Sequence, residues 1–173
     1  MAVVEFEPES DEGSELIATT GDTLMGGAGD ETLNAASGGG SNWLFGREGN
    51  DVLLAGSNDR LIGGPGADQL FVGRGRAVLH GGAGADGFWI VDGELPEQVN
   101  VVRDFQHVSS LLGIRGLTPE TVRSLRVLQV NENTLIQIEG ENVALLRNTK
   151  YICKIIFIFL VVNFREFSSM KAL

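Results

Sequence analysis

The 173-residue chain has few residues that could cross-link it. It contains one cysteine, Cys153, so no disulfide can form within it. Its only histidines, His80 and His107, are far from that cysteine in the sequence, and zinc sites are usually built from clusters of Cys and His. Disulfide scaffolds and zinc-stabilised modules are therefore excluded.

Positive charge is also scarce, and no Lys or Arg occurs in the first 46 residues. The chain has 13 Lys and Arg against 23 Asp and Glu, which gives a net charge of −10. Such a chain repels nucleic acid and anionic membranes, and it attracts cations. We therefore expect no nucleic-acid partner.

Changes in composition divide the chain into four expected segments. Residues 1–17 form an acidic, flexible lead-in without the basic start and apolar core of a secretory signal peptide. Glycine and aspartate dominate residues 18–93, and residues 94–149 read as ordinary globular sequence. Residues 150–173 form an atypical apolar and basic tail that holds all three lysines and no glycine.

A nine-residue pattern repeats through the glycine-rich segment. Its clearest copies are GREGNDVLL (46–54), GGPGADQLF (63–71) and GGAGADGFW (81–89). In each copy an acid stands two places before an apolar residue, and eight such slots follow one another at spacings of 9, 11, 9, 8, 9, 9 and 9 residues. A glycine-rich linker would not keep an apolar residue in phase in this way. The slots hold Asp22, Glu31, Asn42, Asp51, Asp59, Asp68, Ala77 and Asp86.

This pattern resembles the calcium-binding repeat of the RTX family, the repeats-in-toxin or hemolysin-type module, over residues 21–91. The resemblance implies an all-β fold, a right-handed parallel β-roll of nonapeptide repeats. Each nonapeptide would give a turn and a short strand, and two of them would make one coil.

The energetics of such a roll favour a bound cation. The apolar residue of each unit would point inward, because side chains along a strand alternate between its faces. Burying one contributes roughly 1.5–3 kcal/mol, whereas ordering the backbone costs about 1–2 kcal/mol per residue. Eight side chains do not offset the ordering of the whole segment. Glycine carbonyls and carboxylates offer only oxygen ligands, which suit Ca²⁺. The expected core is Leu24, Leu33, Leu44, Leu53, Leu61, Leu70, Leu79 and Phe88.

In the family's roll, alternate turns lie on the same edge, and a metal ion sits between neighbouring turns of that edge. The first edge would carry Glu31, Asp51, Asp68 and Asp86, and the second Asp22, Asn42, Asp59 and Ala77. We expect good sites between Asp51 and Asp68 and between Asp68 and Asp86, and weak or absent sites on the second edge. The expected metal ligands are Glu31, Gly49, Asp51, Asp59, Gly64, Gly66, Asp68, Gly82, Gly84 and Asp86.

The segment after the repeats is predicted to form a small antiparallel β cap that closes the roll. VVRDFQHVSSLLGIRGL (101–117) resembles the segment that follows the last repeat in many family members. LTPETVRSL predicts a short helix with Thr118 as N-cap and Pro119 at the first helical position. LRVLQV, TLIQIE and VALLR predict strands joined by turns.

Three other features need interpretation. Asp104, His107 and Ser109 lie close together in sequence, and we interpret them as surface residues rather than a catalytic triad. An outward apolar row could be covered by the C-terminal strands, or it could bind a protein partner or a second copy. YICKIIFIFLVVNF (151–164) is too short to span a membrane, so we expect a strand or peripheral segment there. A frameshifted or read-through end is the open alternative for the tail. The apolar row comprises Phe45, Leu54, Ile62, Phe71 and Trp89.

Together these features predict a non-enzymatic calcium-binding module that folds on calcium outside the cell or at its surface. The resemblance implies type I secretion without an N-terminal signal peptide. The alternative is the C-terminal calcium-binding fragment of a larger exoenzyme or toxin whose active domain is missing.

Overall fold

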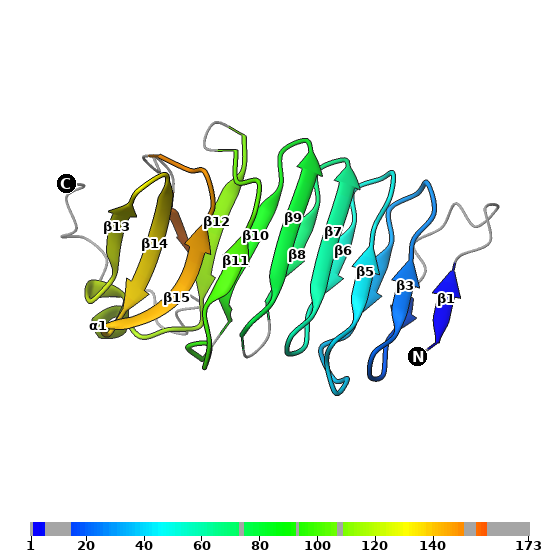
Figure 1. Cartoon of the computed structure of the whole chain (residues 1–173), viewed down its shortest axis with the longest axis horizontal. Coiled ribbons are helices and arrows are strands. Elements are labelled where there is room, and N and C mark those ends of the chain that lie inside the picture. The colour runs from blue at the N-terminus through cyan, green and yellow to red at the C-terminus, as the bar shows by residue number, and fades with distance from the viewer. Residues whose placement is uncertain are drawn as a thin grey trace, which may run out of the picture.

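The computed structural model describes residues 2–5, 15–72, 75–92, 94–106, 109–150 and 155–158. Most of its strands belong to two sheets that face each other and are stacked along one long axis (Figure 1). The larger sheet runs in the order β1 (Val3–Glu5), β3 (Thr23–Met25), β5 (Trp43–Phe45), β7 (Arg60–Pro65), β9 (Val78–Ala83), β11 (Asn100–Val102), β15 (Glu141–Leu146), β14 (Asn133–Ile138) and β13 (Arg126–Val130). The smaller sheet runs in the order β16 (Ile155–Ile158), β12 (Leu111–Arg115), β10 (Gly87–Asp92), β8 (Gln69–Phe71), β6 (Val52–Leu54), β4 (Thr32–Asn34) and β2 (Glu15–Ile17).

The repeats form the predicted parallel β-roll. Successive strands alternate between the two sheets, and each pairs in parallel with the strand one coil away. Most strands of the repeats are only three residues long, so each is stable only because its neighbours pair with it. The repeating apolar residues are all fully buried and in register, Leu24–Leu44–Leu61–Leu79 in the larger sheet and Leu33–Leu53–Leu70–Phe88 in the smaller.

Both sheets continue beyond the repeats. In the larger sheet β11 pairs in parallel with β9, and in the smaller sheet β12 pairs in parallel with β10. The predicted antiparallel segment consists of β13, β14 and β15, and it joins the larger sheet because β15 pairs in parallel with β11. The end of this sheet thus changes from parallel to antiparallel pairing (Figure 1).

The one short helix of the described residues, α1 (Pro119–Arg123), begins as the sequence predicts. The hydroxyl of Thr118 accepts a hydrogen bond from the backbone N–H of Thr121, and Pro119 occupies the first turn, where a missing N–H costs nothing. No residue of this helix is buried, so it serves as a connection rather than as part of the core.

The apolar residues expected to form one outward row lie on two different faces, so the prediction of a single row is wrong. Phe45 and Ile62 belong to the larger sheet, whereas Leu54, Phe71 and Trp89 belong to the smaller. Successive nonapeptides enter opposite sheets, and their outward side chains therefore diverge. The C-terminal strands extend the larger sheet beside β11 rather than covering a face.

On the smaller sheet, the aromatic side chains cover one another. The rings of Phe71 and Trp89 stack with their centroids 5.5 Å apart, and the guanidinium of Arg115 lies over both rings. The indole N–H of Trp89 donates to the side chain of Gln69, and only 8% of this tryptophan is exposed.

The tail contributes one described strand. β16 pairs in parallel with β12, which confirms a strand within the apolar stretch. Residues 151–154, which include Cys153, and residues 159–173 lie outside the described residues. Within the described ranges, no helix is long and apolar enough to cross a membrane.

Candidate metal site along one edge of the roll

The turns that precede the strands of the smaller sheet bring four acids together. Glu31, Asp51, Asp68 and Asp86 each stand directly before a strand, and all four are buried. The backbone N–H of Glu31 donates to Oδ1 of Asp51 (2.9 Å), that of Asp51 to Oδ1 of Asp68 (2.8 Å), and that of Asp68 to Oδ1 of Asp86 (3.1 Å). The carboxylates of Asp51, Asp68 and Asp86 thus each link their own turn to the turn one coil earlier. We call this row of turns the first edge.

Two acids of the first edge each have a second carboxylate oxygen that is unsatisfied. Oδ2 of Asp51 and Oδ2 of Asp68 are buried and have no hydrogen-bond partner. Burying a charged oxygen without a hydrogen-bond partner costs free energy, and native proteins rarely contain such an unpaired oxygen. These two atoms therefore require a ligand or a proton.

The space beside these oxygens exists because the first residue of each turn is glycine. A Cβ added to Gly63 would overlap Oδ2 of Asp68 and would lie 2.5 Å from the carbonyl oxygen of Gly81 in the next turn. A Cβ added to Gly46 would likewise overlap Oδ2 of Asp51 and lie 2.6 Å from the carbonyl oxygen of Gly63. We call the space that such a Cβ would fill a glycine cradle. Each cradle brings a carboxylate oxygen and a carbonyl oxygen from adjacent coils towards one point.

Glu31 begins the same row with altered geometry. A Cβ on Gly26 would lie 2.8 Å from Oε2 of Glu31 and would overlap the carbonyl oxygen of Gly46. Oε2 of Glu31 also accepts a hydrogen bond from the N–H of Gly27 (2.9 Å). The carboxylate of Glu31 is therefore already hydrogen-bonded within its own turn.

The other predicted glycines build the stacked backbone of these turns. All have a positive φ, the region that favours glycine, and a Cβ on any of them would overlap a backbone carbonyl oxygen of the preceding turn. No other residue would let successive turns approach so closely. These glycines are Gly49, Gly64, Gly66, Gly82 and Gly84.

On the second edge, formed by the turns before the strands of the larger sheet, the carboxylates are satisfied by hydrogen bonds from the chain. Oδ1 of Asp59 accepts from the N–H of Asn42 (2.8 Å), and its Oδ2 accepts from the N–H of Gly56 (2.6 Å). The carboxylate of Asp22 accepts from the backbone of Ala2 and from both the backbone and hydroxyl of Thr19. These acids complete their turns with hydrogen bonds, so the edges differ although their sequences look alike.

Burial dominates the electrostatics of the first edge. It raises the pKa of Asp51 to about 7 and that of Asp68 to about 6, and the neighbouring acids add to both increases. Burial likewise raises the pKa of Asp86 and of Asp59. Asp22 behaves in the opposite way, because the hydrogen bonds from Thr19 and Ala2 lower its pKa to about 2.

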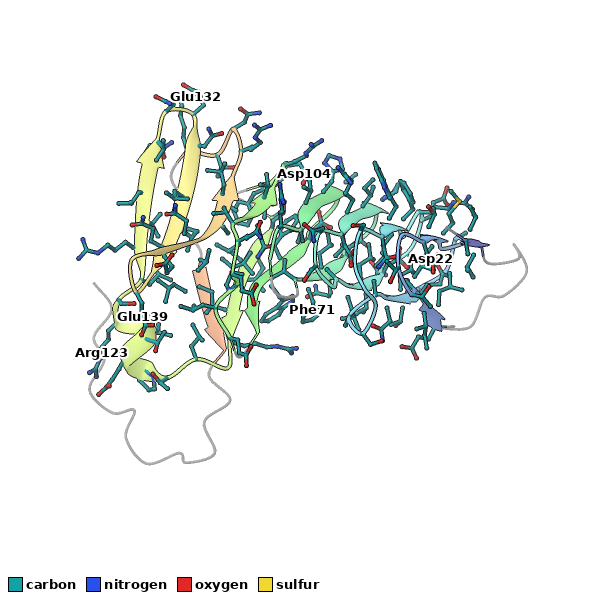
Figure 2. All side chains as sticks on the ribbon, turned by 60° about the horizontal axis from the view of Figure 1, so that its bottom comes forward. Asp22, Phe71, Asp104, Arg123, Glu132 and Glu139 are labelled. Carbon is teal, nitrogen blue, oxygen red and sulfur yellow. The ribbon has the colours of Figure 1, made fainter. Side chains whose placement is uncertain are left out.

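Sequence reasoning missed the role of Asp104, which was interpreted as a surface residue. Figure 2 shows Asp22 near the N-terminal end of the roll and Asp104 farther along it. The two carboxylate oxygens of Asp104 accept hydrogen bonds from the N–H groups of Gly81 and Gly82, at 2.9 and 2.8 Å. Nδ1 of His80 lies 3.3 Å from Oδ2 of Asp104. Asp104 thereby closes the last turn of the first edge. The Asp-Phe pair was the available signal, because Phe105 packs against Phe88 of the core.

Ser110 was also missed, and it takes the place after Asp86. It stands directly before β12, and its hydroxyl is buried without a hydrogen-bond partner. The row of slots on the first edge therefore continues one coil past the last nonapeptide, with a hydroxyl in place of a carboxylate. No acid precedes β12, so the sequence pattern gave no signal for this position.

The chemistry of the first edge suits a hard cation. In the described part of the chain, no three His, Cys, Asp or Glu side chains cluster as a metal site. The available donors are instead carboxylate and backbone carbonyl oxygens, the ligand set that Ca²⁺ accepts in flexible geometry. The unpartnered oxygens and the glycine cradles fit such an ion.

A parallel β-solenoid whose turns stack carboxylates along one edge defines the class of this protein. Comparison with known families finds the RTX calcium-binding nonapeptide repeat in four copies, at residues 19–39, 25–59, 36–70 and 56–88. The chain therefore carries RTX calcium-binding nonapeptide repeats over residues 19–88. The match contains these repeats and no catalytic domain. A search of curated proteins finds no match.

Proposed function

We propose that this protein binds Ca²⁺ along the first edge of the roll and folds when it does so. The main support for this proposal is that Oδ2 of Asp51 and Oδ2 of Asp68 are buried without a hydrogen-bond partner beside glycine cradles. A divalent cation would provide these oxygens with a positive partner, which no described residue supplies. RTX repeats typically bind Ca²⁺, which supports the same identification.

The residues that would hold the ions follow from the turn geometry. Asp51, Asp68 and Asp86 would supply carboxylate oxygens, and Glu31 would supply a weaker one because it also accepts from Gly27. The glycine turns at 49, 64, 66, 82 and 84 would supply carbonyl oxygens at close approach. Asp59 was expected as a ligand, but both of its oxygens accept backbone hydrogen bonds, so we assign it a structural role.

Calcium would contribute folding free energy that the small core does not supply. Without calcium, buried acids in one row repel each other, and the glycine-rich turns lose much entropy on ordering. Because the site does not exist in the unfolded chain, the free energy of binding is also free energy of folding. Extracellular calcium modules commonly bind at about 10⁻⁴–10⁻³ M, so the roll would be unfolded at cytosolic calcium.

This coupling of calcium binding to folding supports the proposal that the protein is secreted and folds outside the cell or at its surface. RTX repeat proteins are typically secreted, and an unfolded chain suits passage through a channel such as that of the type I machinery. We propose a non-enzymatic module. The alternative is the calcium-binding part of a larger exoenzyme or toxin, and a longer reading frame that continues upstream of Met1 would favour it.

Calcium titration of the purified chain tests the proposal directly. Far-UV circular dichroism should show β structure appearing cooperatively with Ca²⁺ and little of it with Mg²⁺, which demands a stricter octahedral geometry. Isothermal calorimetry on the same samples should count the bound ions. A full, cooperative β signal in excess chelator at neutral pH would contradict the proposal.

A further inference from the structure

A groove of about 370 Å³ crosses the outer face of the larger sheet, away from the interior and from the proposed metal ligands. The residues that form it come from β5, β7 and β9 and from the residue that follows β11. Its lining comprises Trp43, Arg60, Leu61, Ile62, Val78, His80 and Arg103. The groove thus exists only where four successive coils are stacked. None of its residues is a proposed calcium ligand, although His80 also contacts Asp104.

Two cationic side chains of the groove have no acidic partner. Arg60 and Arg103 are both exposed, and within the described residues neither guanidinium forms an ion pair. Asp104, the residue after Arg103, is held by the N–H groups of Gly81 and Gly82 and by His80. In a chain of net charge −10, two exposed arginines that form no ion pair within the described ranges make a distinct positive site.

The floor between these arginines is apolar. Ile62 and Val78 lie on neighbouring strands, and Val78 pairs with both Arg60 and Val101. Both floor side chains are half-buried, so they remain available for contact. A ligand that fits the groove therefore needs an apolar group between two negative ones.

The spacing of the arginines suits an extended peptide. β7 and β11 are separated by β9. Arg60, Val78 and Val101 lie in register on these three strands. Arg103 lies two residues beyond Val101 in the strand direction. Standard sheet geometry then places the two arginine backbones roughly 12 Å apart. An extended chain rises about 3.3 Å per residue and presents every second side chain to one side. Acids four residues apart, with an apolar residue midway, match this spacing.

The aromatic residue of the groove argues against a sugar or a nucleobase. The ring of Trp43 stacks on Phe45, with centroids 5.9 Å apart, and the guanidinium of Arg60 lies 4.7 Å from its centroid. The ring therefore already contacts both of these side chains, although 37% of Trp43 remains exposed. Recognition of bases and sugars by stacking needs an open aromatic face.

We propose that this groove binds an acidic peptide segment of a partner protein, with two carboxylates on Arg60 and Arg103 and an apolar side chain over Ile62 and Val78. This inference goes beyond calcium binding. It assigns a separate recognition surface to the outer face of the roll.

The test uses the full-length, calcium-loaded protein and a fluorescently labelled peptide with the central sequence Glu-Thr-Leu-Thr-Glu. Anisotropy should show saturable binding that weakens with salt, because the charges are exposed. The same peptide with Gln in place of both Glu should bind at least about tenfold more weakly, since charge-assisted hydrogen bonds to guanidinium are lost. Arg60→Gln combined with Arg103→Gln should have a similar effect.

Arg123→Gln is the matched control, because Arg123 is an exposed arginine on α1 and does not line the groove. It should leave peptide binding unchanged. All variants should keep the calcium-induced circular dichroism of the wild type, so that a failure of calcium-driven folding is recognised separately. Absence of saturable peptide binding by the folded protein, or equal binding by the double variant, would overturn the proposal. Preferential binding of polygalacturonate over the peptide would also overturn it and would assign the groove to acidic polysaccharides.

Discussion

The backbone N–H of Asp51 donates to Oδ1 of Asp68 across 2.8 Å, and yet Oδ2 of each of these aspartates is buried without a partner. One oxygen of Asp68 thus joins two coils of the chain, while the other faces a glycine cradle. On the second edge the corresponding oxygen of Asp59 accepts from Gly56. The same residue type therefore stabilises the turn by itself on one edge and requires a cation on the other.

Substitution of single acids should reveal this difference in the number of calcium ions bound. Asp68 lies between two well-formed turns, so Asp68→Ala should weaken two sites, whereas Asp86→Ala should weaken one. Asp22→Ala should weaken almost none, because its carboxylate is occupied by Thr19 and Ala2. Isothermal calorimetry of the three variants would count the lost ions. Equal losses for Asp22→Ala and Asp68→Ala would refute the assignment of the edges.

Acid should partly replace calcium. Burial raises the pKa of Asp51 from 3.8 to about 7 and that of Asp68 to about 6, so the folded chain without metal holds these protons more tightly than the unfolded chain. The resulting stability is fully present below pH 3.8 and is lost as the pH rises through about 6 to 7. For Asp51 alone, the shift corresponds to a loss on the order of 4 kcal/mol.

The measurement is far-UV circular dichroism in chelator, where the calcium-free chain should show more β structure, with a higher melting temperature, at about pH 5 than at about pH 8. Asp22, whose pKa is lowered to about 2, loses its stabilising effect only in stronger acid and does not interfere in this range. In excess calcium the order should reverse, because calcium binds the deprotonated carboxylates. Identical β signals and melting at both pH values without calcium would show that burial does not raise the pKa of Asp51 and Asp68.

A methyl group placed in one cradle should remove calcium binding there. Gly63→Ala would put its Cβ onto Oδ2 of Asp68, which must move away from the carbonyl oxygen of Gly81. We expect the calcium midpoint of folding to rise at least about tenfold. Gly27→Ala is the matched control, since its Cβ would lie 3.6 Å from the nearest atom, an ordinary contact. Circular dichroism against calcium concentration measures both, and equal midpoints would show that the cradle is not a metal site.

The sequence was sufficient to predict the roll because each short strand repeats one inward residue in phase. Leu53 and Leu70, for example, lie in register and are fully buried as the period requires. The helix at Pro119 and the three C-terminal strands were likewise predictable from local signals. The parallel pairing of β15 with β11 was not, because it joins residues far apart in sequence with no motif in common.

The candidate site was predictable only in part. The phase of the acids gives the two edges, but it does not say which oxygens are already hydrogen-bonded. Asp59 therefore fits the pattern of a ligand, although the N–H of Gly56 donates to its second oxygen. The Asp-Phe pair marks Asp104, but it does not identify its partners, because Asp104 reaches Gly81 and Gly82 across more than twenty residues of sequence.

Truncation of the tail should separate calcium binding from the protection of a sheet edge. β16 pairs with β12 at the end of the smaller sheet, and it has no pairing with the strands next to Asp51 or Asp68. A chain that ends at Thr149 should therefore keep the calcium midpoint of the full chain within about twofold. It should nevertheless associate more readily, because removal of β16 leaves the backbone of β12 unpaired and open to another strand.

A chain that ends at Ile158 is the control, because it keeps β16 and loses only residues 159–173. It should match the full chain both in calcium midpoint and in association. Calcium-dependent circular dichroism measures the first property, and sedimentation velocity in saturating calcium measures the second. If the chain ending at Thr149 bound calcium tenfold more weakly than the chain ending at Ile158, β16 would have to support the turns of the first edge through the whole smaller sheet. If instead the two truncated chains stayed equally monomeric, the edge of β12 would be protected by something other than β16.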